Sequence, residues 1–334
     1  MSVHGERNGG RGTRDLVSDS ESEPGPYFNY LRQRGSGWAR SVVEDYWVIQ
    51  AERCRAQVEL VLPDACVELY FNLGPVGRTI IEGRGVRGAN DRDERQGVRG
   101  ESAALTPHPS PLIPAVPAPR RSWVVGPHSA PLLVAKETRD CDIVGVRLHP
   151  GVAPQLLGVS ARELEGTAVD LDAMWGSVVD EIRERLSESA DAHARVRVVE
   201  QAIVRRLART PAATDASRVR ALCRSVGELA DASVGAVAKA HGLTHRQVIQ
   251  LFDLHVGLKP KAYHRVHRLR QVIRDIHSPR PAPWARLALQ HGYCDQAHLI
   301  NDFRKLTGLT PVEYAARRMS VGQGSVPYRL AAAS

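Results

Sequence analysis

The chain has 334 residues, of which 43 % are apolar and 5 % aromatic, enough for two ordinary domains with mainly aliphatic cores. Its five cysteines are scattered and odd in number, with no Cys-x-x-Cys pair, so we expect neither a disulfide framework nor a zinc cluster. No apolar run approaches 18 residues, and the polar N-terminal segment has no apolar signal-peptide core. We therefore expect a cytoplasmic protein without a membrane span.

The net charge of +8 is unevenly distributed. Residues 215–334 contain 18 Lys and Arg against 8 Asp and Glu, whereas residues 1–214 contain 27 against 29. The excess positive charge therefore lies in the C-terminal third, as expected of a segment that meets a polyanion. Arginines outnumber lysines 40 to 5, so part of this charge is compositional and does not by itself establish nucleic-acid binding.

The first part of the chain predicts a β-rich domain behind a polar tail. Residues 1–26 are rich in Gly, Ser and Glu and are predicted to be disordered. Residues 27–150 predict a small β-sandwich or barrel-like domain. Its expected strands lie in 41–50, 57–74, 123–126, 130–137 and 141–151, with a turn at 63–65 dividing the second segment into two strands. Gly-Arg repeats and a proline-rich run make 83–122 a predicted disordered insertion.

From residue 151 onward the apolar spacing becomes helical. Residues 151–214 predict a helical connector, with helices in 152–157, 172–186 and 192–209 and a linker at 210–214. Residues 215–319 predict an all-α domain, and 320–334 a disordered tail. The expected fold is α+β and multidomain: a β-rich sensor or dimerisation domain, a helical connector, and two helix-turn-helix motifs joined by a linker helix.

A repeat lies within the C-terminal segment. Shifting the chain by 51 residues aligns seven positions of a first copy (residues 241–263) with a second copy (291–314). The aligned pairs are Thr244 with Asp295, Val248 with Leu299, Phe252 with Phe303, Gly257 with Gly308, Leu258 with Leu309, Pro260 with Pro311, and Tyr263 with Tyr314. One supersecondary unit is therefore used twice.

The repeated unit predicts a helix-turn-helix. Gly242 ends a short helix where a positive φ is needed, and Thr244 can cap the next helix, as Asp295 can in the second copy. Val248 and Phe252 lie four residues apart and are expected to be buried together. The opposite face is polar, which is the arrangement of a helix that enters a DNA major groove with its N-terminus first.

The exposed faces of these two helices supply the candidate DNA contacts. Arg246 can bind guanine, and the amides of Gln250, Gln296 and Asn301 can bind adenine. Basic residues near helix ends, including Arg304, Lys305, Lys259 and Lys261, are candidates for phosphate contacts. Residues 260–277 predict a connecting helix of roughly 27 Å. Two reading helices on one DNA face must lie about 34 Å apart, so we expect one protomer to bind an asymmetric site with two adjacent major grooves.

The second copy resembles the second motif of the AraC/XylS transcription regulators, with the pattern A-x-x-x-G-[FY]-x-D-Q followed by F-[KR]-x-x-x-G-x-x-P-x-x-Y from Ala288 onward. The resemblance covers about a hundred residues. It implies base contacts by Arg246, Ile249, Gln250, Gln296, Ala297, His298 and Asn301, with His245 on the same face. Ala297 stands where serine is usual, and His298 and Leu299 replace an aromatic pair, so the target sequence is not predictable.

The N-terminal half resembles the β-rich sensor domains of such regulators, which implies a small-molecule effector, dimerisation, or both. Glu68 and Arg147 are charged within apolar strands, so they are expected to form an internal ion pair or to contact a ligand. Trp47 and Tyr70 are candidates to line a pocket, although packing in the core explains them equally.

Three alternatives to an effector-responsive regulator remain open at this point. Scattered Cys54, Cys66 and Cys141 invite comparison with Ada-type alkylation repair proteins, but the cysteine pairs of that site are missing. His264 and His267 are spaced to ligate a metal, but without a nearby third ligand they are expected to face solvent or DNA. A ligand-independent DNA-binding adaptor is the third alternative. We therefore expect no enzyme activity, cofactor or metal; the expected partner is double-stranded DNA, with RNA polymerase, a small effector and a second copy of the chain as further candidates.

Overall fold

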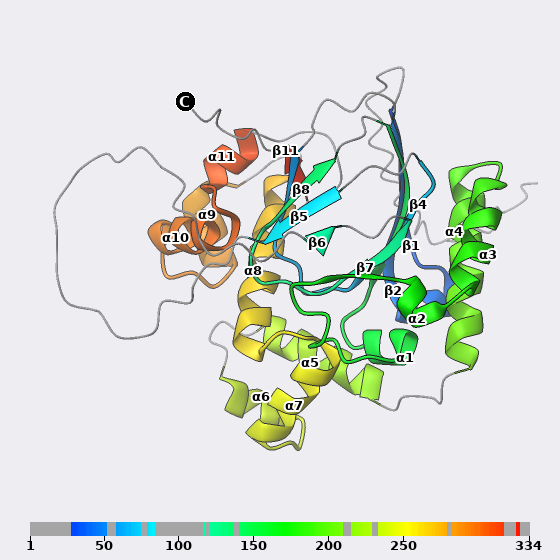
Figure 1. Ribbon diagram of the computed structural model, residues 1–334. Coiled ribbons are helices and arrows are strands. Elements are labelled where there is room, and N and C mark those ends of the chain that lie inside the picture. The colour runs from blue at the N-terminus through cyan, green and yellow to red at the C-terminus, as the bar shows by residue number, and fades with distance from the viewer. Residues whose placement is uncertain are drawn as a thin grey trace, which may run out of the picture.

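The computed structural model describes residues 28–51, 58–74, 79–83, 116–117, 121–136, 140–209, 215–228, 233–278, 282–316 and 325–327. It contains two antiparallel sheets flanked by helices, followed by an all-helical C-terminal part (Figure 1). The predicted fold class is therefore confirmed. The expected disorder of 1–26 and of most of 83–122 and 320–334, the linker at 210–214, and Cys54 lie outside the described residues.

Sheet A has six strands in the order β1-β2-β9-β4-β7-β10. The strands are β1 (Phe28–Arg34), β2 (Val43–Ala51), β9 (Cys141–Leu148), β4 (Glu68–Asn72), β7 (Ser122–Val125) and β10 (Ala168–Asp170), and a 3-10 helix, η1 (Gly37–Ser41), joins β1 to β2. Sheet B has the order β11-β3-β8-β5-β6. Its strands are β11 (Ser325–Pro327), β3 (Val58–Val61), β8 (Leu132–Lys136), β5 (Thr79–Gly83) and β6 (Val116–Pro117).

The two strands expected on either side of residues 63–65 are present, and the turn between them leads from sheet B to sheet A. Two expectations of disorder are corrected. Val116–Pro117, in the predicted disordered insertion, pairs with β5, and Ser325–Pro327, in the predicted disordered tail, pairs with β3. Local composition did not reveal these strands because their partners are distant in sequence.

Four helices cover one face of sheet A: α1 (Ala153–Leu157), α2 (Asp172–Trp175), α3 (Val178–Ser187) and α4 (Ala192–Ala208). The single helix expected over 172–186 is divided in two because Gly176 has a φ of 65°. Strand β4 shows the resulting alternation, since Leu69 and Phe71 are fully buried beneath the helices. Glu68 and Tyr70 therefore lie on the opposite face of the sheet.

The C-terminal part consists of α5 (Asp215–Glu228), α6 (Val234–Ala240), α7 (His245–His255), α8 (Pro260–Ile276), α9 (Trp284–Gln290), α10 (Gln296–Thr307) and α11 (Pro311–Ala316). Helix α8 runs from the α6–α7 group to the α9–α11 group (Figure 1). Its apolar residues Val266, Leu269, Ile273 and Ile276 are buried. None of the described helices is long and apolar enough to cross a membrane.

One turn of the β-rich part packs against both helical groups. Leu60 and Leu62 belong to the hydrophobic core around α10, which contains Leu299 and Phe303. Ala65, only three residues after Leu62, belongs to the separate core around α7. The segment 60–66, which we call the inter-sheet turn, therefore lies between the two helix-turn-helix cores and against α8.

Candidate nucleic-acid interface

The first copy has the predicted turn and cap. Gly242 follows α6 with a φ of 63°, a backbone conformation that glycine adopts without steric cost. Thr244 Oγ1 accepts a hydrogen bond from the Gln247 amide at 3.2 Å, and Gln247 Oε1 accepts one from the Thr244 amide at 2.8 Å. This reciprocal capping box begins α7 at the expected position.

The second copy repeats this geometry with different residues. Gly292 has a φ of 71° after α9, and Asp295 Oδ1 accepts a hydrogen bond from the His298 amide at 2.7 Å. In the second helix of each copy, the two apolar residues that lie four positions apart are fully buried. The phenylalanine of each pair packs against the tyrosine that both copies share. The ring centroids are 5.5 Å apart for Phe252–Tyr263 and 5.7 Å apart for Phe303–Tyr314. Both predicted helix-turn-helix units are thus confirmed.

The candidate DNA contacts lie on the outer faces of α7 and α10. All are exposed except Ile249, which is half-buried: His245, Arg246, Ile249, Gln250, Gln296, Ala297, His298, Asn301, Arg304 and Lys305. The exposed amides and guanidinium can therefore donate and accept hydrogen bonds outside the protein. Their contact with DNA remains a prediction.

A cluster of charged side chains holds α10 against α8. It was not predicted from the sequence. Asp302, which is buried, accepts hydrogen bonds from Arg265 at 2.6 Å and from Arg268 at 3.1 Å, both on α8. The Tyr293 hydroxyl lies 3.4 Å from the same carboxylate, and the Arg268 guanidinium lies 3.8 Å from the centroid of the Tyr293 ring. The available signal was the position of Asp302, three residues after Leu299 on the buried face of the helix.

The end of α7 is instead attached to the start of the helical connector through backbone groups. The Gly151 amide donates to the His255 carbonyl at 3.1 Å, and the Ala161 amide donates to the Leu254 carbonyl at 2.8 Å. Gly257 has a φ of 80°, and a Cβ placed there would lie 2.5 Å from the Ala161 carbonyl oxygen. The first copy is therefore packed closely against the segment 151–161.

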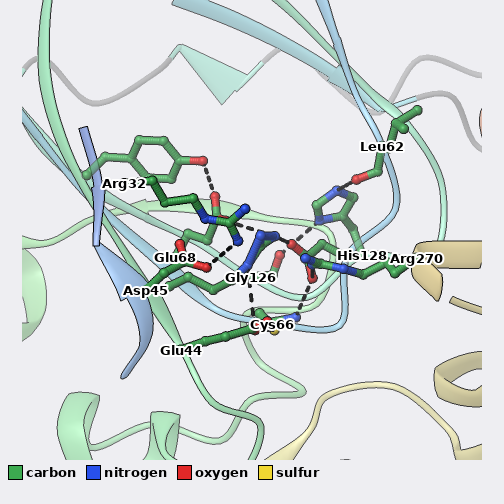
Figure 2. A network of polar contacts seen from close by, with 12 residues as sticks. Arg32, Glu44, Asp45, Leu62, Cys66, Glu68, Gly126, His128 and Arg270 are labelled. Atoms are coloured by element: carbon green, nitrogen blue, oxygen red, sulfur yellow. Dashed lines mark hydrogen bonds and ion pairs between the residues drawn. The ribbon is translucent and has the colours of Figure 1, made fainter. Parts of the chain in front are cut away.

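A buried ionic network connects the inter-sheet turn to both sheet A and α8 (Figure 2). Asp64 forms ion pairs with Arg147 of β9 and with Arg270 of α8. Arg147 also lies 3.1 Å from Glu68, so the predicted Glu68–Arg147 ion pair is present. Arg270 was not identified from the sequence, where it occurs as one of several arginines in a helical segment.

The position of the inter-sheet turn is fixed by His128. The backbone of Asp64 exchanges hydrogen bonds with that of His128 at 3.0 and 2.7 Å. The His128 ring nitrogens lie 3.0 Å from the Leu62 carbonyl oxygen and 3.2 Å from that of Gly126 (Figure 2). The backbone that carries the Asp64 carboxylate is therefore held in place by hydrogen bonds to His128.

Burial and neighbouring charges shift the pKa values of two carboxyl groups in this network. Burial raises the pKa of Glu68 to about 7, against the hydrogen bond that Tyr70 donates to it. For Glu44, burial also opposes ionisation, but the attraction of Arg147 and Arg270 outweighs it and lowers the pKa to about 2. Glu44 is thus the firmly ionised partner, whereas Glu68 titrates near neutrality.

The four predicted effector residues come together on the face of sheet A opposite α3 and α4. Strand register aligns Trp47, Gly145, Tyr70 and Trp123 in one row across four strands. The Trp47 and Tyr70 rings are 5.3 Å apart edge to face, and Tyr70 stacks on Trp123 at 5.1 Å. We call these rings the aromatic row; Trp123 was not among the predicted effector residues.

The expectation for the two histidines of α8 is wrong. His264 is buried and its Nδ1 lies 2.8 Å from the Val226 carbonyl oxygen of α5, while His267 stacks on Tyr263 at 5.9 Å. Helix α5 packs on the helix face that was expected to meet solvent or DNA. Within the described residues no group of three or more His, Cys, Asp or Glu side chains is arranged to hold a metal ion.

Comparison with known proteins gives two family matches in this chain. Residues 237–317 match the model of a helix-turn-helix domain, and residues 40–170 match a domain of unknown function, DUF6597. No curated protein matches the sequence significantly.

The chain is also similar to solved structures of ToxT from Vibrio cholerae. One structure of ToxT in a P21 crystal form has a TM-score of 0.42 at 8 % identity, covering 87 % of this chain and 98 % of that chain. Unsaturated fatty acid bound wild-type ToxT from strain SCE256 has a TM-score of 0.44 at 8 % identity, with coverage of 85 % and 97 %. A similarity at this TM-score does not determine what the present chain binds.

Two N-capped helix-turn-helix units on one connecting helix lie within the segment that matches the family model. Residues 237–317 therefore form a helix-turn-helix domain of the AraC type, the kind of domain that DNA-binding transcription regulators carry.

Proposed function

We propose that one protomer binds an asymmetric duplex site by placing α7 and α10 in two adjacent major grooves. The observation that carries this proposal is the pair of N-capped helices whose first turns expose polar side chains and which are joined by α8. In this proposal Arg246 and Gln250 contact bases in one groove, and Gln296 and Asn301 contact bases in the other.

In this proposal three parts of the chain have separate functions. Residues 27–150 form a sensor or dimerisation domain, residues 151–214 a helical connector, and residues 215–319 the DNA-binding domain. The protein acts in the cytoplasm on the nucleoid and responds to a small effector. The support for an effector is the meeting of the aromatic row with a buried ionic network that extends to α8.

The test is selection of bound duplexes from a random pool, using the purified full chain at several salt concentrations. We expect an asymmetric consensus whose two halves have centres roughly 10 base pairs apart. Arg246→Ala should relax sequence preference in one half and Asn301→Ala in the other, each weakening binding about tenfold. Arg197→Ala, which removes an exposed arginine of α4, is the matched control and should change neither half.

Two results would contradict the proposal. The first is binding without sequence preference that disappears by about 200 mM salt, because that is the behaviour of phosphate contacts alone. The second is relaxation of the same half-site by both variants, because the two helices would then not occupy separate grooves.

A further inference from the structure

Two segments of the molecule contribute to both helix-turn-helix cores: α8 and the inter-sheet turn. Among the described residues, the core around α7 and the core around α10 have no member in common. Helix α8 places Val266 in the first core and Leu269 in the second. The inter-sheet turn does the same with Ala65 and Leu62. The turn therefore packs on α8 where one core ends and the other begins.

An ion pair joins the turn to this same part of α8. Asp64 lies two residues after Leu62 in the turn. Its carboxylate pairs with Arg270, which directly follows Leu269 in α8 (Figure 2). The same carboxylate pairs with Arg147 of β9, and the side chains of Asp64 and Arg147 are both buried. One carboxylate therefore links α8 to sheet A, and a buried ion pair that loses one partner is strongly destabilised.

The inter-sheet turn is itself held in place within the β-rich part. The Cys66 amide donates to the Asp64 carboxylate at 3.1 Å, which fixes the carboxylate on the turn. The backbones of Asp64 and His128 exchange two hydrogen bonds. Directly after the turn, the Leu148 amide of β9 donates to the Val67 carbonyl at 2.9 Å. The turn therefore offers α8 a support whose position is set by the two sheets.

This support acts on the one helix that carries both copies. The first copy shares the core that contains Val266 of α8, and the second is held to α8 by Asp302. Long helices are seldom straight and curve gently, so α8 does not by itself behave as a rigid rod. A bend in α8 changes both the distance and the angle between α7 and α10. Leu269 and Arg270 lie near the middle of α8, where a lateral support opposes bending most effectively.

We propose that the inter-sheet turn, joined to α8 by the Asp64–Arg270 ion pair, is a positioning element that fixes the separation of α7 and α10 along the duplex. Leu62, Asp64 and Arg270 are then positioning residues, which act through α8 and touch no base. The inference rests on the proposed binding of two adjacent major grooves and names the residues that set the spacing of the two half-sites. The competing explanation is that α8 alone sets this spacing.

The test measures how strictly the full chain requires one half-site spacing. Adding or removing one base pair between the halves of the selected duplex moves one groove by about 3.4 Å and turns it by about 35°. Fluorescence anisotropy at constant salt compares the affinities for the selected, lengthened and shortened duplexes. The unaltered chain should lose about tenfold or more in affinity on either change, because a supported α8 cannot follow the displaced groove. Asp64→Asn and Leu62→Ala should each lose about threefold or less, because α8 is then able to bend.

Asp142→Asn is the matched control. It also neutralises a carboxylate of an ion pair in the N-terminal part, but this pair joins β9 to Arg195 of α4 and does not involve α8. General loosening of the β-rich part would make Asp142→Asn tolerant of the altered spacings, whereas a positioning role of the turn leaves it as strict as the unaltered chain. Asp64→Asn keeps the shape of the side chain, so it remains informative if Leu62→Ala does not fold, and circular dichroism verifies the fold of each variant.

Three results would overturn the inference: equal binding of all three duplexes by the unaltered chain, an unchanged spacing requirement in the folded Asp64→Asn and Leu62→Ala variants, or equal tolerance in Asp142→Asn. Each of these leaves the proposed function standing, because the selected duplex is still bound with sequence preference. Failure of the unaltered chain to select a two-part consensus would instead refute the proposed function, and this inference with it.

Discussion

The two helix-turn-helix copies share their turn, cap and buried aromatic pair, but they are attached to the rest of the molecule in different ways. The first copy is joined to the start of the helical connector by backbone hydrogen bonds at Leu254 and His255. The second is joined to α8 by the side chain of Asp302. The repeated residues therefore build each unit, and the residues that differ between the copies determine what each unit is fastened to.

This difference gives the two copies different dependence on the N-terminal part. The end of α7 directly contacts segment 151–161, whereas α10 is oriented mainly through α8. The inter-sheet turn contacts both cores, with Leu62 in one and Ala65 in the other. A displacement of that turn therefore acts on the two copies together, while a displacement of 151–161 acts on the first copy.

The largest effect on stability is expected from removing Asp302, the side chain that links the second copy to α8. Asp302→Ala leaves Arg265 and Arg268 facing each other without their shared carboxylate, and Arg268 is mostly buried. Loss of one partner of a buried ion pair costs about 3–5 kcal/mol, so the free energy of unfolding should fall by about that amount. Urea denaturation followed by circular dichroism measures the change.

The matched control for this variant lies in the first copy. Asp253→Ala also removes an aspartate with two basic partners, Arg162 at 3.1 Å and Lys259 at 2.6 Å, but both partners are more than half exposed. Solvent-exposed ion pairs contribute about 0–1 kcal/mol. Equal destabilisation by Asp253→Ala and Asp302→Ala would show that the two copies are not anchored differently.

Two equivalent glycines should respond unequally to alanine. Gly257 and Gly308 both have a positive φ, 80° and 75°, so each substitution carries the left-handed penalty of about 1 kcal/mol. At Gly257 the added Cβ also meets the Ala161 carbonyl and Pro127 at 2.5 Å, whereas at Gly308 nothing lies within 4 Å. We expect Gly257→Ala to cost about 2–3 kcal/mol and Gly308→Ala about 1 kcal/mol, measured as shifts in the urea midpoint.

The sequence was sufficient for the parts of this comparison that depend on local patterns. Glycine turns, polar caps and apolar residues four apart follow from backbone geometry within one or two helical turns, so both copies and α8 could be located. Strands β2, β7, β8 and β9 were likewise visible as short apolar runs. The identity of these elements did not depend on knowing their neighbours.

The contacts that attach each copy to the rest of the molecule could not be predicted, because they join residues far apart in the chain. Glu68 and Arg147 were noticed only because each is charged within an apolar strand, whereas Arg270 lies in an amphipathic helix where arginine is ordinary. The pairing of β3 with β11 joins residues more than 260 positions apart, with no local signal in the tail. The burial of His264 similarly required knowledge of where α5 packs.

Lowering the pH should reduce the stability of the folded protein through His267, which lies on the part of α8 next to the first copy. Burial and the positive charge of Arg274 lower the pKa of His267 to about 4, and one ring nitrogen is buried without a hydrogen-bond partner. The unfolded chain, with a pKa near 6.5, binds the proton first, so this contribution to stability is lost as the pH falls from about 6.5 to 4.

His267→Gln removes this titration from the folded protein. The loss of unfolding free energy between pH 6.5 and 4 should therefore be smaller than in the unaltered chain by about 2 kcal/mol. His245→Gln, at an exposed position of α7, should leave the loss unchanged. An identical pH dependence of the unaltered chain and His267→Gln would refute the assignment.

The smallest expected difference concerns the two caps. Thr244→Ala removes the hydroxyl that accepts from the Gln247 amide and donates to Gln247 Oε1 at 3.0 Å, while the backbone amide of residue 244 can still donate to Gln247 Oε1. Asp295→Ala removes one bond to the His298 amide together with a negative charge at a helix N-terminus. Each should cost about 1 kcal/mol, but only the Asp295→Ala loss should shrink with added salt, because the dipole interaction is screened and a neutral cap is not. Denaturation at 0.05 and 0.5 M NaCl distinguishes them, and the same salt response in both variants would contradict this account of how the two helices begin.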